Sequence, residues 1–102
     1  MKLTPGSRWK SAVCDTEAVI VRPPREAGAL ECGGAPMVSI KDVPAAGIEP
    51  DMALMGGSLL GKRYADDAHG IEVLCTKPGR GTLTFAGAPL TTREAKKLPS
   101  SD

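Results

Sequence analysis

Short runs of Val, Ile and Leu alternate along the chain with clusters of glycine and proline. This alternation is typical of short β-strands separated by turns. In the first half, it predicts a strand at Ala18–Arg22 and a return strand at Ala29–Cys32. In the second half, the corresponding strands are expected at Ile71–Thr76 and Thr82–Phe85. The pattern therefore predicts two β-hairpins, each closed by a Pro/Gly turn.

The two predicted hairpins belong to an internal repeat. The segment Gly28–Met37 aligns with Gly81–Leu90, and five of the ten aligned positions are identical. Upstream, Gly6–Trp9 aligns with Gly61–Tyr64. Two hairpins of this size cannot bury their apolar faces alone, so we expect them to pack on each other. The expected fold is a small all-β pseudo-dimer within one compact domain.

The repeat divides the chain into a first repeat, a Gly/Pro/Met-rich connector, a second repeat and a tail, at residues 1–37, 38–60, 61–90 and 91–102. In the connector, Asp51 follows Pro50 and is a plausible N-cap for one helical turn. In the tail, Thr91 and Glu94 make a Thr-x-x-Glu capping box. The tail is therefore predicted to form a short C-terminal helix that ends at Pro99.

Composition narrows the class of protein. The 102 residues include 12 glycines and 9 prolines but only three aromatic side chains, which argues against long helices. Basic and acidic residues number 13 and 12 and are interspersed, so no basic, aromatic-studded face for nucleic acid is expected. No apolar run approaches the ~20 residues of a membrane span. Without a secretory signal or a paired-cysteine framework, the chain is expected to be cytoplasmic.

The two halves carry related sets of residues. The first has Trp9, a Ser11-x-x-Cys14 loop and Cys32-Gly33-Gly34; the second has Tyr64, an Asp66-x-x-His69-Gly70 loop and Phe85-Ala86-Gly87. Each half resembles desulforedoxin, a very small iron protein of the rubredoxin-like class. Because that family forms homodimers, the resemblance implies that the chain is a fusion of two desulforedoxin-like units.

The same resemblance implies that the iron sites are lost. The four positions that hold cysteine in the family hold other residues in most cases, namely Ser11, Cys14, Cys32 and Gly33 in the first half and Asp66, His69, Phe85 and Ala86 in the second. A four-thiolate centre cannot form from either set, which argues against inherited electron transfer. Phe85 is expected to be buried where a ligand once stood, so that apolar packing replaces metal.

Cys14 and Cys32 are the sharpest candidates for a functional site, because the ancestral geometry would bring their sulfurs into one pocket beside Ser11. Three interpretations stay open: two buried apolar thiols, a divergent metal site completed by Ser11 or a partner, and a disulfide. In the second half, His69 is expected to bond to Asp66 or to the backbone within its loop, and a metal site at Asp66 and His69 is the weaker alternative. Cys75 is expected to pack in the core.

The connector concentrates flexible apolar residues, namely Met52, Leu54, Met55, Leu59 and Leu60. They are expected either to cap the open end of the core or to form a patch for a protein partner. No catalytic motif accompanies them, and His69 is the single histidine, so we expect no enzyme.

The leading hypothesis is a non-catalytic accessory or protein-interaction module that holds no cofactor and is monomeric when isolated. The alternative is a small metalloprotein with one iron, zinc or copper ion at Cys14 and Cys32, acting in metal delivery or electron transfer. A third hypothesis is a thiol-redox protein that cycles these two cysteines between dithiol and disulfide.

Overall fold

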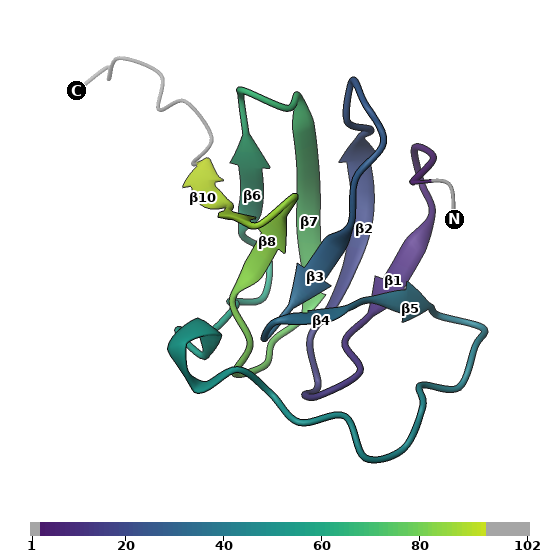
Figure 1. The fold of residues 1–102 in the computed structure, drawn as a ribbon. Helices are drawn as coiled ribbons and strands as arrows, with labels where there is room; N and C mark the ends of the chain where they lie inside the picture. Colours follow the sequence, from purple (N-terminus) through teal and green to yellow (C-terminus); the bar gives the residue numbers. More distant parts are fainter. Residues whose placement is uncertain (1–2, 94–102) are drawn as a thin grey trace.

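A computed structural model describes residues 3–93, and they form a small all-β fold of two antiparallel sheets (Figure 1). The six-stranded sheet has the order β10-β6-β7-β2-β1-β5, with bounds Thr91–Arg93, Arg63–Asp66, Ile71–Lys77, Glu17–Arg22, Arg8–Lys10 and Val38–Ser39. The four-stranded sheet has the order β4-β3-β8-β9, with bounds Ala35–Pro36, Leu30–Cys32, Leu83–Phe85 and Ala88–Pro89. The expected all-β class is confirmed.

The strand order of each sheet is symmetric about its centre. Strands at equal distances from the two edges are counterparts in the two repeats, such as β5 and β10 or β1 and β6. The centre of the large sheet is the pair β2–β7, with Ile20 opposite Val73, and the centre of the small sheet is β3–β8. Two hydrogen bonds between the halves are reciprocal: Gly33 N donates to Thr82 O at 3.1 Å, and Ala86 N donates to Ala29 O at 3.0 Å. Such reciprocity is the signature of a self-complementary interface.

The predicted strands are present, but the predicted hairpins are wrong. Strand β2 pairs with β1 and β7, whereas β3 lies in the other sheet and pairs with β4 and β8. Likewise, β7 pairs with β6 and β2, whereas β8 lies in the other sheet and pairs with β9 and β3. A two-stranded hairpin is marginal in water because it leaves both faces exposed. By pairing across the repeat, the strands build two sheets that bury one face each against the other.

The core lies between the sheets and includes the three aromatic side chains. Trp9 on β1 and Tyr64 on β6 occupy matching positions and are both buried. Phe85 is 0% exposed, which confirms the expected burial at this position. Cys75 is also fully buried within the same apolar cluster, as expected.

The connector runs from β5 to β6 along the lower edge of the molecule in Figure 1. Its predicted helical turn is confirmed as the short 3-10 helix η1, Met52–Leu54, whose N-cap Asp51 accepts a hydrogen bond from Ala53 N at 3.0 Å. Farther along, Ser58 forms an isolated antiparallel bridge with Gly79. That bridge brings the end of the connector against the turn after β7.

The predicted helix in the tail is wrong where the structure describes it. Thr91–Arg93 is strand β10, and it pairs with the edge of β6, just as β5 pairs with β1. An unpaired sheet edge favours a further strand because its backbone groups lack partners. The rest of the predicted helix, residues 94–98, lies outside the described residues. Over the described range, no helix has the length and apolar character needed to cross a bilayer.

Candidate functional site

The fold brings Cys14 and Cys32 together. Cys14 lies in the loop between β1 and β2, and Cys32 ends β3 in the other sheet. Their sulfur atoms are 3.8 Å apart. Cys32 is 0% exposed, whereas Cys14 is only partly buried, and neither forms a disulfide here. The two thiols therefore form a pair with one accessible member and one enclosed member.

Ser11 shapes the loop that carries Cys14. Its Oγ accepts hydrogen bonds from the backbone N–H groups of Val13 and Cys14, each at 3.1 Å, and the side chain is buried. These bonds give partners to two backbone N–H groups of a tight turn. Ser11 thus holds the Cys14 sulfur in position beside Cys32.

A chain of hydroxyl groups leads away from the Cys14 sulfur. The Cys14 thiol donates to Thr16 Oγ1 at 3.3 Å, and this hydroxyl shares a 2.6 Å hydrogen bond with Ser58 Oγ. Ser58 then donates to the carbonyl oxygen of Gly81 at 3.0 Å. Thr16 and Ser58 are both buried, so these polar groups are paired in a low-dielectric environment where their dipoles act strongly.

The surroundings act on the two thiols in opposite directions. Burial raises the pKa of Cys14, but hydrogen bonds from Ser11, Thr16 and the Gly81 backbone outweigh it and lower the pKa to about 7. Burial raises the pKa of Cys32 to about 12, with repulsion from Cys14 acting in the same direction. At neutral pH, Cys14 is therefore the nucleophilic thiol and Cys32 stays protonated.

Two glycines from the turn after β7 lie directly against the thiol pair. A Cβ atom at Gly81 would stand 2.5 Å from the Cys32 sulfur and 3.1 Å from the Cys14 sulfur. At Gly79, a Cβ atom would stand 2.3 Å from Thr16 Oγ1 and 3.1 Å from the Cys14 sulfur. Both distances under 3 Å are shorter than nonbonded contacts allow, so only glycine fits at either position.

A groove of about 490 Å³ opens beside Cys14. Its wall includes the connector residues Met52 and Met55, and its rim carries Asp15 and Arg80. The remaining lining residues are Val13, Pro50 and Gly79. The groove therefore combines one accessible thiol, adaptable methionine side chains and charges of both signs.

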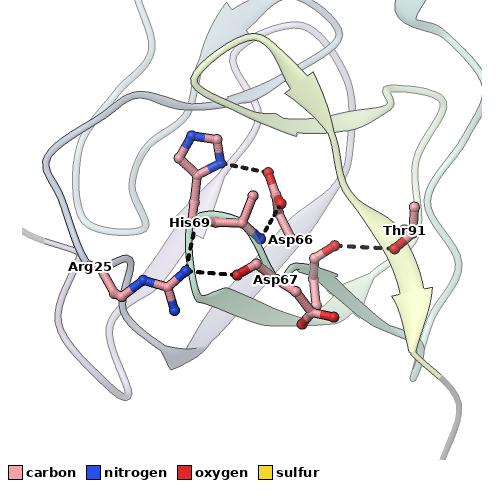
Figure 2. A network of polar contacts seen from close by, with 7 residues as sticks. Arg25, Asp66, Asp67, His69 and Thr91 are labelled. Atoms are coloured by element: carbon pink, nitrogen blue, oxygen red, sulfur yellow. Dashed lines mark hydrogen bonds and ion pairs between the residues drawn. The ribbon is translucent and has the colours of Figure 1, made fainter.

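The corresponding loop in the second half has the same backbone hydrogen bond but different chemistry (Figure 2). Asp66 Oδ1 accepts from Ala68 N at 2.9 Å, as Ser11 Oγ does from Val13 N. Asp66 Oδ2 is 2.6 Å from His69 Nδ1, and this hydrogen bond lowers the pKa of Asp66. The expected local pairing of Asp66 with His69 is thus present in the structure.

Phe85 and Arg25 fill the space around that second loop. The Phe85 ring packs edge-on against the His69 ring, with centroids 5.3 Å apart. Arg25 Nη2 donates to the carbonyl oxygens of Asp67 and Ala68 at 2.8 and 2.7 Å. In the sequence, Arg25 follows Pro24 as Gly79 follows Pro78. A long charged side chain therefore lies over the second loop where the first has a glycine, and the hollow beside the second loop, lined by Arg25, Glu26, Ala68 and His69, is about 330 Å³.

The five connector residues proposed for a partner differ in their exposure. Met52 is 78% exposed, and Leu59 and Leu60 are exposed as well, whereas Leu54 and Met55 are half-buried. Met52 and Met55 line the groove, but Leu59 and Leu60 do not. Within the described residues, no three His, Cys, Asp or Glu side chains gather around a common point.

Sequence reasoning missed Thr16, Ser58, Gly79 and Gly81 as parts of the site. Thr16 could have been found from the sequence, since a hydroxyl two residues after Cys14 lies near the thiol. Ser58 could not, because the bridge to Gly79 brings it to the thiols from a distant part of the chain. The two glycines belong to the Pro/Gly turn predicted after the strand at Ile71–Thr76, but nothing in the sequence indicates that this turn lies against the cysteines.

Comparisons with protein-family models, with curated proteins and with solved structures gave no match. The resemblance to desulforedoxin therefore stays a hypothesis that rests on the residues quoted for it. Any functional conclusion has to come from the geometry of the two loops.

Proposed function

We propose that the protein is a non-catalytic interaction module whose partner docks in the groove beside Cys14. The observation that carries this proposal is the difference between two equivalent loops. The hollow beside one is about 490 Å³ and is lined by a thiol and two methionines, while the hollow beside the other is about 330 Å³ and is lined by Arg25, Glu26, Ala68 and His69. Binding is assigned to the first half, and the second half serves as the scaffold.

The scaffold is proposed to descend from a dimer of half-size, metal-binding units. The reciprocal hydrogen bonds between the halves and the symmetric strand order support this descent. Loss of a structural metal costs a small domain much of its folding free energy. Fully burying a phenyl group such as Phe85 contributes roughly 1.5–3 kcal/mol, and joining the halves in one chain removes the entropic cost of association.

The chemistry of the groove favours a protein partner. Methionine adapts to varied apolar surfaces, and Met52 is mostly exposed in the isolated chain. Asp15 and Arg80 at the rim offer one charge of each sign, which suits the mixed charges of a polypeptide.

A photocrosslinking residue at position 52 tests the docking surface in the native host. We expect a discrete adduct with one protein, identified by mass spectrometry and reproduced with that protein after purification. The matched control is the same residue at Val43, which is 89% exposed but does not line the groove. Equal labelling from both positions would refute docking in the groove.

Metal content tests the second part of the proposal. Protein purified from its native host should contain metal well below one equivalent, and its thermal midpoint should be unchanged by a strong chelator. Stoichiometric metal, or a large drop of the midpoint with chelator, would overturn the proposal of a metal-free scaffold.

One distance favours a second candidate function, a divergent metal site at Cys14 and Cys32. For a tetrahedral ion with metal–sulfur bonds of ~2.3 Å, the sulfurs are separated by about 3.8 Å. The observed separation is 3.8 Å. The pair supplies two ligands, so a partner would have to complete the shell of one iron, zinc or copper ion. In this case Cys14→Ser should abolish uptake in a zinc titration, and uptake unchanged by that variant would exclude the site.

A further inference from the structure

The thiol pair differs from two ordinary core cysteines in the access that each sulfur has to solvent. Cys14 lines an open groove, while Cys32 is 0% exposed directly behind it. The sulfurs are in van der Waals contact at 3.8 Å, so no other atom separates them. A reagent in the groove therefore meets Cys14 first, and Cys32 is the thiol placed to react next.

We propose that Cys14 and Cys32 form a thiol–disulfide exchange site that is oxidised by small-molecule disulfides of the glutathione class. Cys14 is the attacking thiol, and Cys32 is the resolving thiol. The activity goes beyond the docking role, because it needs only residues of this chain and no partner protein.

The geometry allows the internal disulfide to close with a small movement. A disulfide bond is about 2.05 Å long, so the two sulfurs must approach by roughly 1.8 Å. Cys14 lies in a loop rather than in a strand, and its side chain faces the open groove, so a rotation of that side chain is available. Gly79 and Gly81 leave room along this path, which any larger residue would obstruct.

The exchange proceeds in two balanced steps. The Cys14 thiolate attacks one sulfur of the small disulfide, forming a mixed disulfide and releasing one thiolate that takes up the Cys14 proton from solvent. Cys32 then loses its proton and attacks the Cys14 sulfur, which breaks the mixed disulfide and releases the second thiol with that proton. In sum, the protein dithiol is oxidised by two electrons and the small disulfide is reduced to two thiols.

The hydroxyl groups beside Cys14 support its role as the attacking thiol. Thr16 Oγ1 lies 3.3 Å from the Cys14 sulfur and is itself bonded to Ser58. A hydroxyl at this position can accept from the thiol or, after rotation, donate to the thiolate. The third cysteine has no such access, since Cys75 is 0% exposed and its thiol donates to the carbonyl oxygen of Lys77 at 3.2 Å.

The test uses the reduced full chain with oxidised glutathione, followed by intact-mass measurement and peptide mapping. We expect the mass to fall by two hydrogen atoms, with a crosslink that joins Cys14 to Cys32 and with Cys75 still free. Two glutathione adducts without a crosslink, a crosslink to Cys75, or no oxidation would each overturn the proposal. This measurement on the unaltered protein does not depend on the folding of any variant.

Variants then separate the two roles. Cys32→Ser should accumulate a stable mixed disulfide at Cys14, because the resolving thiol is gone. Cys14→Ser should give no adduct at Cys32, which the groove does not reach. Cys75→Ala is the matched control and should oxidise as the unaltered protein does. An adduct at Cys32 in folded Cys14→Ser would refute the assigned order of attack.

Discussion

At the scale of single residues, the properties of the two cysteines come from their neighbours. Cys14 and Cys32 have the same chemistry in isolation, but one accepts hydrogen bonds at the groove and the other is enclosed. The groups responsible lie within a few ångströms and include Thr16, two residues along the chain. Local contacts thus give each thiol a separate character.

The rate at which Cys14 is alkylated should depend on pH with a midpoint at about 7, well below the ordinary value of 9.0. The midpoint shifts to lower pH because the thiolate is the form that reacts, and a lowered pKa keeps the thiolate populated at lower pH. The midpoint is measured by iodoacetamide labelling at about ten pH values between pH 5 and pH 10, with the labelled fraction of Cys14 determined by peptide mapping.

Thr16→Val provides the control for that profile, since it keeps the shape of the side chain and removes the hydroxyl. Without this donor the midpoint should move upward. A wild-type midpoint near 9, or a midpoint that Thr16→Val leaves in place, would contradict the assigned cause.

Gly79→Ala should lower the free energy of unfolding by about 1–3 kcal/mol, because its Cβ atom would overlap buried Thr16. The clash includes the Thr16 backbone nitrogen at 2.5 Å, which cannot move aside as a side chain can. Urea unfolding measures the change. Val43→Ala is the control at an exposed site and should change stability by less than about 0.5 kcal/mol. Equal stabilities of the two variants would show that the turn is not packed on the loop.

At the scale of elements, equivalent loops carry different side chains on the same backbone. The Ser11 and Asp66 side chains each accept the N–H of the second residue along, so the loop conformation is retained. What differs is the residue that the equivalent turn places against each loop. The turn after β2 brings Arg25, and the turn after β7 brings Gly79 and Gly81.

Arg25→Ala should loosen the loop after β6, because two hydrogen bonds from the guanidinium to backbone carbonyl oxygens are lost. We expect faster hydrogen exchange of the Gly70 amide, which donates to Asp66 O at 2.8 Å within this loop. The loss of stability should be about 1 kcal/mol, since the bonds are exposed to solvent.

Arg22→Ala at the exposed end of β2 is the matched control and should leave exchange in that loop unchanged. Unaltered exchange in Arg25→Ala would mean that the loop holds its shape without its covering side chain.

At the scale of the whole molecule, the two repeats share their central strand pairs. β2–β7 and β3–β8 each join one strand from either half, so neither repeat has a complete sheet of its own. Thermal unfolding should therefore be a single transition with equal calorimetric and van't Hoff enthalpies. Differential scanning calorimetry measures both, and two resolved transitions would show that the halves fold independently.

Much of the fold could be predicted because it depends on neighbouring residues. Alternating apolar positions and Pro/Gly turns located the four predicted strands, which correspond to β2, β3, β7 and β8, and the Asp51 cap located the 3-10 turn. The tail was misassigned because a capping box is a local signal too, and the free edge of β6 outweighed it at Thr91–Arg93. Edge pairing adds backbone hydrogen bonds that an isolated turn of helix lacks.

The sequence by itself determined the repeat, with Trp9 and Tyr64 at matching positions, and the places of β2, β3, β7 and β8, because these follow from local alternation and residue type. Only the tertiary structure decided which strands pair and what surrounds the thiols. Pairing across the repeat buries more apolar surface than a hairpin does, and this choice brings Ser58 and Gly81 against Cys14 and Cys32. Contacts between segments this far apart depend on the assembled sheets, so no short stretch of sequence encodes them.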